Sequence, residues 1–372
     1  MAKPIGPRCN MRCGYCYYIG KTDSLPRHPG RMDLAAVEGY IAQRFAASRE
    51  QSVHFEWHGG EPTLMGLDFY RQVARAQRRL CPPGRSFTNG LQTNGLLLND
   101  AWADFLAGEG FSVGLSLDGP ADLHDRYRRT PDGGPTHARV MRSWEVLRRH
   151  GVFTNLLCVL HEANAGRPDE VYGFFRSSGA AYLQFLPLVT PAADGRPNPA
   201  AAAPEAVGDF LCRVFDLWLA SDVGRIVVQT FDEALRPICG LPHALCIHSE
   251  TCGRAVVLER DGGVYACDHY VDEEHRIGSL GERSLADLAA DPRLGNFGRA
   301  KRDLLPDACR SCEVLAFCNG GCPKDRLEPS PGGGGRINHL CPAYKKVFLH
   351  CRAGLERVAA HLASGAPLRD FN

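Results

Sequence analysis

Three cysteines near the start of the chain constrain its fold more than any other feature of the sequence. They are spaced C-x3-C-x2-C in the segment Cys9-Asn10-Met11-Arg12-Cys13-Gly14-Tyr15-Cys16. Thiolates this close together on one loop suit an iron–sulfur cluster, and a [4Fe–4S] cluster normally takes four cysteines. Three ligands leave one iron with an open position, the feature that separates a catalytic metal site from a closed structural one. The alternative is a zinc knuckle completed by a distant histidine, although zinc ligands are usually two separated cysteine pairs.

The composition narrows the class of protein. A length of 372 residues with 44% hydrophobic residues suits one large α/β domain followed by a smaller one. With 43 basic and 42 acidic residues the net charge is +1, so no overall field attracts nucleic acid or an anionic membrane. The sequence has no signal-peptide pattern and no apolar run long enough to span a bilayer, which predicts a cytoplasmic protein. In that reducing compartment the 16 cysteines are expected to bind metal rather than form disulfides.

The first half of the chain alternates between strand-like and helix-like stretches. The strand candidates are residues 53–57, 86–92, 111–117, 152–160 and 182–186, and the helix candidates are 68–80, 100–108, 137–150, 168–178 and, further on, 205–220. This alternation predicts a parallel sheet with helices packed outside it. With the short segment before Cys9 we expect about six βα units, fewer than the eight of a closed TIM barrel.

Polar motifs follow three of these strands, at the carboxyl ends where a barrel carries its chemistry. They are HGGEPT at 58–63, QTNG at 92–95 and SLDG at 116–119. The paired glycines of the first motif let backbone approach a ligand closely. Taken singly, each motif is equally well explained as a turn at a strand end.

In this order the motifs resemble the radical S-adenosylmethionine (SAM) enzymes, whose cluster motif has an aromatic residue, here Tyr15, before its last cysteine. The resemblance implies a partial (βα)6 barrel, open on one side, in which SAM chelates the open iron. The cofactor contacts that it implies are Tyr15, Gly59, Gly60, Glu61, Ser116 and Arg128. Gln92 would lie toward the substrate.

Eight more cysteines cluster in the second half, enough for two further four-cysteine clusters. Their order is Cys246-x5-Cys252-x14-Cys267, then Cys309-x2-Cys312-x5-Cys318-x3-Cys322, then Cys341. The spacing resembles the SPASM domain, which holds two auxiliary [4Fe–4S] clusters in peptide-modifying radical SAM enzymes. The resemblance implies one cluster on Cys246, Cys252, Cys267 and Cys322 and another on Cys309, Cys312, Cys318 and Cys341, although spacing alone permits other partitions. A zinc ribbon on residues 309–322 is the alternative, but it would leave four clustered cysteines unused.

The expected domains are a radical SAM barrel at 1–190, a linker and connecting helix at 191–238, and a SPASM domain with a C-terminal helix at 239–372. Residues 190–204, rich in Pro and Ala, are predicted to be a surface connection. Of the five remaining cysteines, Cys239 is near enough to Cys246 to compete as a ligand. The others are expected to be small core hydrophobes: Cys81, Cys158, Cys212 and Cys351.

Together these features resemble the anaerobic sulfatase-maturating enzymes over nearly the whole chain. Those enzymes use SAM and three [4Fe–4S] clusters to oxidise a Cys or Ser of a sulfatase, in a C/S-x-P/A-x-R segment, to Cα-formylglycine. The resemblance implies a flavodoxin or ferredoxin-type electron donor and Asp268, which follows Cys267, as the catalytic base. It also implies substrate contacts from Tyr18 and from His58, which stands where the family has glutamine. Taken alone, Asp268 would be a turn residue or one that tunes the cluster.

Two other functions fit parts of the pattern. One is a radical SAM/SPASM maturase that crosslinks or epimerises a ribosomally made peptide, although such enzymes often carry a leader-binding extension for which there is no room before Cys9. The other is a non-catalytic iron–sulfur electron carrier, which would need neither GGEP nor an open iron.

The short segment before Cys9 also predicts a truncated first strand. If neutral His58 accepts a hydrogen bond from substrate, an ordinary pKa near ~6.5 predicts that turnover falls in mildly acidic buffer.

Overall fold

The computed structural model describes residues 1–18, 30–189, 198–253 and 255–371. The chain folds into two compact units that interleave along the sequence. The first unit comprises Met1–Ser116, Tyr127–Thr154 and Gly253–Phe297, and the second comprises Leu117–Arg126, Asn155–Cys252 and Gly298–Asn372. The predicted domain boundaries follow the sequence instead, and they stay a prediction. Part of the predicted surface connection, residues 190–197, lies outside the described residues.

The first unit is built on a mixed sheet with the strand order β10-β9-β8-β1-β2-β3-β4. Strands β8, β1, β2, β3 and β4 run parallel, whereas β9 and β10 are antiparallel additions. The strands are β1 (Ala2–Lys3), β2 (Ser52–Trp57), β3 (Ser86–Thr93), β4 (Phe111–Ser116), β8 (Val257–Glu259), β9 (Gly263–Tyr265) and β10 (Arg276–Ser279).

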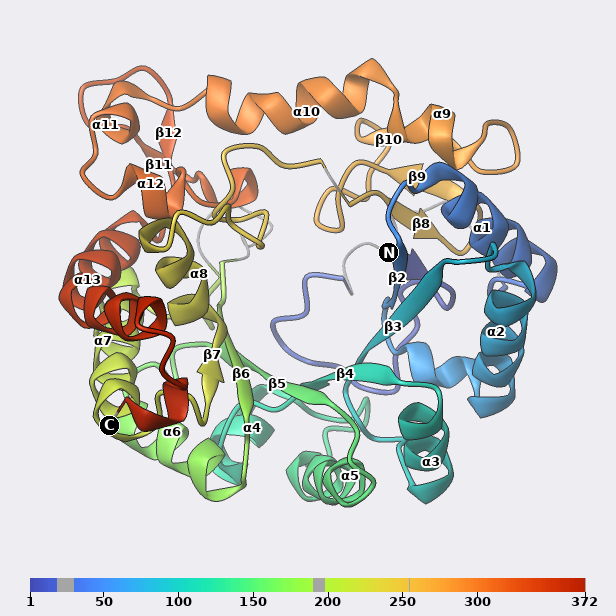
Figure 1. The fold of residues 1–372 in the computed structure, drawn as a ribbon, viewed down its shortest axis with the longest axis horizontal. Helices are drawn as coiled ribbons and strands as arrows, with labels where there is room; N and C mark the ends of the chain where they lie inside the picture. Colours follow the sequence, from blue (N-terminus) through green and yellow to red (C-terminus); the bar gives the residue numbers. More distant parts are fainter. Residues whose placement is uncertain (19–29, 190–197, 254, 372) are drawn as a thin grey trace. The chain divides into compact units, whose positions relative to one another are not determined.

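Helices cover the outer side of strands β2 to β4 (Figure 1). They are α1 (Leu34–Ala47), α2 (Leu67–Leu80), α3 (Asp100–Gly108) and α5 (His137–Arg149), with α9 (Leu285–Ala289) beside α1 and the 3-10 turn η2 (Pro62–Met65) after β2. Side chains on alternate positions of β2 are fully buried, namely those of Val53, Phe55 and Trp57. Strict alternation of this kind makes a strand with one face in the core.

The N-terminal segment enters the middle of this sheet. Strand β1 pairs in parallel with β2 on one side and with β8 on the other, so Lys3 is the register partner of Glu259. The strand that we expected to be truncated is therefore short, but it forms. Its position brings the first residues of the chain beside β8, the strand that ends at Glu259.

The second unit contains the parallel strands β5 (Thr154–Leu160, all but Thr154 in this unit), β6 (Tyr182–Pro187) and β7 (Val227–Val228). Its long helices α7 (Pro204–Ser221) and α13 (Cys341–Ala363) pack against each other. Helix α6 (Pro168–Ser177) packs on α7, and helix α8 (Gln229–Ile238) packs on α13. The short helix α4 (Ala121–Tyr127) belongs to this unit as far as Arg126.

Short elements carry the cysteine-rich segment. They are α10 (Pro292–Asp303), whose part from Gly298 belongs to the second unit, α11 (Asp307–Arg310), α12 (Leu315–Cys318), the 3-10 turns η3 (Pro323–Asp325) and η4 (Leu368–Asp370), and the hairpin β11 (Glu328–Pro329) with β12 (Arg336–Ile337).

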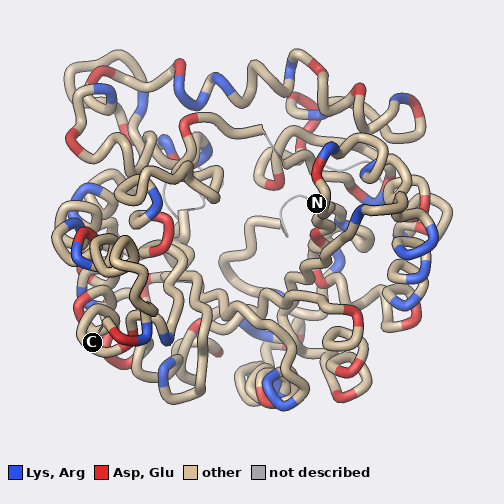
Figure 2. The backbone as a smooth tube through the Cα atoms, in the orientation of Figure 1, with Lys and Arg blue, Asp and Glu red and all other residues tan. Residues whose placement is uncertain are grey.

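Every strand and helix predicted from periodicity is present, with ends that differ by at most two residues. Acidic and basic residues are both spread over the described elements (Figure 2), and the net charge of the whole sequence is +1. Among the helices of the described chain, none combines the length and the hydrophobicity that crossing a bilayer requires.

Candidate active site and cluster ligands

The three N-terminal cysteines lie half-buried on the loop between β1 and α1. Two backbone hydrogen bonds fasten this loop to the last residue of α4 (Ala121–Tyr127) and to the segment that follows it, from Gly14 N to the carbonyl of Tyr127 (3.0 Å) and from Arg12 N to the carbonyl of Arg129 (2.8 Å). The loop is thus fixed on either side of Cys13.

Hydrogen-bond donors surround the sulfur of Cys9. The backbone N–H of Met11 lies 3.3 Å from Cys9 Sγ, and the side-chain amide of Asn94 lies 3.6 Å from it. Burial raises the pKa of the Cys9 thiol to about 11, against the opposing effect of the Met11 N–H. A thiol that resists ionisation but faces N–H donors suits a sulfur that gives up its proton to a metal, and N–H···S bonds are a regular feature of iron–sulfur sites. The donor set therefore fits a cluster.

The two glycines after β2 bring backbone against the cluster loop. Gly60 N donates to the carbonyl of Gly6 (2.7 Å) and Glu61 N donates to that of Arg8 (2.9 Å). A Cβ atom at position 60 would lie 2.2 Å from the Arg8 carbonyl oxygen, so only glycine fits there. The GGE motif therefore supports the loop that carries Cys9, and its predicted contact with SAM stays a prediction.

Glu61 ties the ends of two strands together. Its Oε1 accepts hydrogen bonds from Thr63, through N (3.0 Å) and Oγ1 (2.5 Å), and from Thr93 Oγ1 (2.7 Å). Its Oε2 accepts from Asn94 N at 2.8 Å. The side chain is fully buried. A carboxylate satisfied in this way has a structural task, because it orients the Asn94 that reaches Cys9.

Other predicted cofactor and substrate residues lie in the same unit. Gln92 at the end of β3 donates to the hydroxyl of Ser116 at the end of β4 (3.3 Å). The guanidinium of Arg128 lies 5.5 Å from the centre of the Tyr15 ring, and Tyr15 packs against Tyr127. The structure thus brings these residues together in two pairs, and their contacts with SAM or substrate stay predictions.

Asp268 lies between a hydroxyl and an ammonium. Its Oδ2 accepts a hydrogen bond from the hydroxyl of Tyr17 at 2.6 Å, and its Oδ1 forms an ion pair with Lys3 Nζ. Burial by itself raises the pKa of this carboxyl, but the Lys3 ammonium, with His58 and His269, more than offsets that effect and holds the pKa well below its usual range. Asp268 is consequently an ionised acceptor in the folded protein.

A second carboxylate shares the same lysine. Glu259 Oε1 lies 3.9 Å from Lys3 Nζ and accepts a hydrogen bond from the Tyr18 hydroxyl. Lys3 Nζ also lies 3.8 Å from the centre of the Tyr18 ring, a cation–π distance. Tyr18, predicted to contact substrate, therefore has its hydroxyl engaged by Glu259 and its ring covering Lys3.

His58 follows β2 and is electrostatically coupled to Asp268. Its Nδ1 accepts a hydrogen bond from Gly59 N at 2.8 Å, which assigns the proton to Nε2. Burial lowers the pKa of His58 below its ordinary value, although the Asp268 carboxylate opposes that shift. The imidazole is thus neutral and presents an N–H donor. The ordinary pKa assumed from sequence was wrong.

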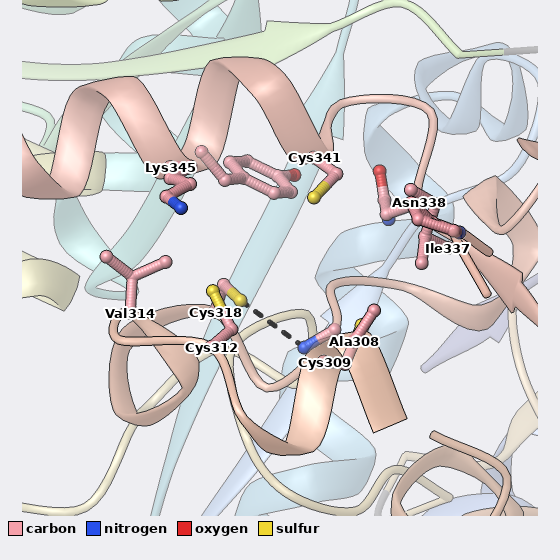
Figure 3. Close-up of a pocket in the computed structure, with 12 residues that line it drawn as sticks. Ala308, Cys309, Cys312, Val314, Cys318, Ile337, Asn338, Cys341 and Lys345 are labelled. Atoms are coloured by element: carbon pink, nitrogen blue, oxygen red, sulfur yellow. Dashed lines mark hydrogen bonds between the residues drawn. The ribbon is translucent and has the colours of Figure 1, made fainter. Parts of the chain in front are cut away.

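In the second unit, four cysteines line one cavity of about 190 Å³. They are Cys309, Cys312, Cys318 and Cys341, and Figure 3 shows them together with Val314 and Lys345 around the same space. Gly320 N donates to Cys318 Sγ at 3.4 Å. Four thiols and an N–H donor around one mostly apolar cavity match the ligand set proposed for one auxiliary cluster.

Three of the other proposed ligands surround a lysine of the second unit. Cys246, Cys252 and Cys322 are all electrostatic neighbours of Lys301. The fourth, Cys267, belongs to the first unit, next to Asp268.

The remaining cysteines divide by burial. Cys158, Cys212 and Cys351 are buried, as expected for core residues, and Cys81 is half-buried. Cys239 is exposed at the end of α8.

Comparison with known proteins decides the family. The Radical SAM superfamily matches residues 4–175, and the iron–sulfur cluster-binding SPASM domain matches residues 246–313. A serine-type anaerobic sulfatase-maturating enzyme of Bacteroides thetaiotaomicron is 36% identical over 366 residues, which cover 94% of this chain and 88% of that relative. The chain belongs to the anaerobic sulfatase-maturating enzymes.

Other relatives extend this likeness. A cysteine-type anaerobic sulfatase-maturating enzyme of Clostridium novyi is 32% identical and covers 98% of this chain and 97% of its own. The solved structure of native anSMEcpe with bound AdoMet and Kp18Cys peptide superposes with a TM-score of 0.88 at 30% identity, over 97% of this chain and 98% of that one. The predicted radical SAM fold with a SPASM domain is confirmed, as are SAM and iron–sulfur clusters as the cofactors of this maturating enzyme.

Sequence reasoning missed three residues around Asp268. Tyr17 follows the last cysteine of the cluster motif without being part of it, and Lys3 and Glu259 belong to no motif. The sequence did offer one signal, a single charged residue beside apolar ones: Lys3 follows Met1 and Ala2, and Glu259 follows Val257 and Leu258. In the structure both side chains are almost fully buried. Charged side chains are rarely buried unless paired, so such positions point to a partner.

Proposed function

We propose that this enzyme oxidises a Cys or Ser side chain of a sulfatase polypeptide to Cα-formylglycine, with Asp268 as the base. The observation that carries the assignment of the base is the placement of Asp268 between the Tyr17 hydroxyl and the Lys3 ammonium. The reaction class follows from family membership, since the relatives include both serine-type and cysteine-type enzymes.

The cofactors would be held by the cysteines described above. Cys9, Cys13 and Cys16 would hold the SAM-binding cluster, and the two SPASM sets would hold the auxiliary clusters. When bound, SAM and its cluster supply the radical that removes a hydrogen atom from the substrate Cβ, and the auxiliary clusters supply acceptors for the second electron. The protein contributes orientation and exclusion of water.

Asp268 would take the proton that oxidation releases from the thiol or hydroxyl. Each carboxylate oxygen has two lone pairs, so Oδ1 and Oδ2 can keep Lys3 and Tyr17 and still accept from substrate. The lowered pKa keeps the carboxylate ionised before substrate arrives. His58, with its proton on Nε2, would donate a hydrogen bond to the same substrate group.

The proposal includes partners and a compartment. A sulfatase segment of the C/S-x-P/A-x-R type would be the substrate, and a flavodoxin or ferredoxin-type protein the electron donor. A reducing compartment, the cytoplasm, suits half-buried thiols that must bind iron rather than oxidise.

The test uses two synthetic peptides that differ only in the target residue, with Cys or Ser in the x-Pro-x-Arg context. The reconstituted enzyme, SAM and a chemical reductant are incubated with each peptide under anaerobic conditions. Mass spectrometry should show replacement of the thiol or alcohol by an aldehyde, which a hydrazide probe then traps. If SAM is cleaved but neither peptide forms an aldehyde, and a short precursor peptide instead loses two hydrogens, the crosslinking maturase replaces this proposal.

A further inference from the structure

Helix α10 packs against the loop that carries Cys246 and Cys252, two proposed ligands of an auxiliary cluster. Gly298 and Lys301 are three residues apart and so lie on one face of the helix. Cys252 N donates to the carbonyl of Gly298 at 3.2 Å, and a Cβ atom at position 298 would lie 2.3 Å from the Cys252 carbonyl oxygen. Residue 298 must therefore be glycine for the helix to approach this cysteine.

Lys301 anchors the other end of the same loop. Its side chain is 1% exposed, and its ammonium donates to the carbonyls of Cys246 (2.6 Å), Ile247 (2.9 Å) and Ser249. An ammonium has three N–H donors, so all three are used on this one loop.

The charge of Lys301 has no carboxylate partner within the part of the chain that the structure describes. Its hydrogen bonds go to backbone carbonyls, and its electrostatic neighbours are the thiols of Cys252, Cys246 and Cys322. The guanidinium of Arg326, a further electrostatic neighbour, adds a second positive charge instead of compensating the first. A buried cation is costly unless a compensating negative charge is near. Iron-bound thiolates of a cluster, with a net negative charge, would supply that compensation.

We propose that Lys301 is the positioning residue and counter-charge of the auxiliary cluster held by Cys246, Cys252 and Cys322. It holds the Cys246 loop in place, and its positive charge favours the reduced, more negative cluster, which raises the reduction potential. Net charge and hydrogen bonding around the sulfurs set the potentials of iron–sulfur clusters. The inference goes beyond the proposed function and requires the cluster alone, not a sulfatase substrate.

The chain offers a matched control at the other auxiliary site. Lys345 interacts with the thiols of Cys312 and Cys341, but its side chain is 51% exposed and pairs with Glu313 at 3.1 Å. Solvent and the carboxylate screen this ammonium, so its removal should change the neighbouring cluster little.

The experiment uses the full chain with Cys9, Cys13 and Cys16 replaced by Ala, so that the auxiliary clusters are observed alone. Into this background Lys301→Met, Lys301→Arg and Lys345→Met are introduced separately. Each protein is reconstituted anaerobically, its iron and sulfide are measured, and the clusters are titrated with reductant while electron paramagnetic resonance follows them. Lys301→Met should move one midpoint potential to a more negative value, whereas Lys301→Arg and Lys345→Met should leave both midpoints close to the parent values.

The iron content of each variant decides how the remaining outcomes are interpreted. If Lys301→Met loses one cluster, about four irons, while Lys301→Arg keeps both, the positioning role is supported. An unchanged pair of midpoints in a fully loaded Lys301→Met protein overturns the proposal. Loss of both auxiliary clusters together also overturns it, because Lys301 would then serve the fold and not one cluster.

Discussion

Tyr17 donates its hydroxyl hydrogen to Asp268 across 2.6 Å, although 251 residues separate the two in sequence. The donor follows the last cysteine of the SAM-binding motif, and the acceptor follows a cysteine of the SPASM domain. Lys3 pairs with the other oxygen of the same carboxylate. The proposed base, on the SPASM segment, is thus held by two residues of the N-terminal segment, which makes its geometry sensitive to substitutions at Lys3 and Tyr17.

Replacement of Asp268 by Asn should separate hydrogen abstraction from deprotonation. The variant should keep its clusters and still produce 5′-deoxyadenosine, because abstraction comes first. Aldehyde formation should fall by roughly 10²–10⁴, the usual cost of removing a general base. Chromatography of the nucleoside and mass spectrometry of the peptide measure the two steps separately.

Asp272→Asn is the control for this variant. Asp272 is four residues away, 41% exposed and paired with His275 at 2.6 Å. The Asp272→Asn variant should retain the full aldehyde yield. A near-normal aldehyde yield from an Asp268→Asn enzyme with all its clusters would show that Asp268 has only a structural role.

Lys3→Met should destabilise the protein, because it leaves Asp268 and Glu259 without their shared buried cation. Breaking a buried ion pair by removal of one partner costs about 3–5 kcal/mol in unfolding free energy. Lys346→Met, which removes an exposed partner of Asp209, should cost about 0–1 kcal/mol. Urea unfolding of the cluster-loaded proteins, followed by circular dichroism, compares the two. Equal decreases in the free energy of unfolding would mean that the ion pairs of Lys3 stabilise the protein no more than a surface ion pair does.

His58 should not limit activity in mildly acidic buffer. Burial lowers its pKa in the folded protein, so the imidazole stays neutral as the pH falls through the ordinary value of about 6.5. The unfolded chain does take up a proton in that range, so stability present at neutral pH is lost as the pH falls through the ordinary value. His58→Gln should lack this acid-side loss and keep its aldehyde yield, since the amide also supplies an N–H donor.

The measurement is a pair of profiles, aldehyde yield and unfolding midpoint, for wild type, His58→Gln and His58→Ala. The alanine variant should lose yield at every pH because it supplies no donor. A wild-type yield that drops near pH ~6.5 while the glutamine variant does not would contradict the lowered pKa.

Reconstituted protein should contain about twelve irons per chain, the content of three [4Fe–4S] clusters. Replacement of Cys9, Cys13 and Cys16 by Ala should remove one cluster and all SAM cleavage. Cys318→Ala should instead disturb the cluster of its own cavity and leave SAM cleavage possible. Elemental analysis for iron and zinc provides the check, and a preparation with zinc and a single cluster would refute the auxiliary assignment.

The fold was predictable where local patterns decide it. Residues 53–57 form a strand because alternate side chains are apolar, and the cysteine spacing pointed to the family before any contact was known. The hydrogen bonds of the Glu61 carboxylate were not predictable, because its partners Thr93 and Asn94 lie at the end of another strand. The burial of Lys3 likewise depends on Glu259, far along the chain. The periodicity of apolar residues along the sequence does not reveal which distant residues pair.

Strand β1 lies between β2 and β8, with Lys3 directly beside Glu259 in register. During synthesis the N-terminal cysteine loop leaves the ribosome long before β8 does. At about 5–20 residues per second, the delay is roughly ten to fifty seconds. Throughout that interval β1 has an open edge, and Lys3 has neither of its carboxylate partners. A cluster bound at Cys9, Cys13 and Cys16 within that interval would stand in a chain that does not yet contain Asp268, the proposed base.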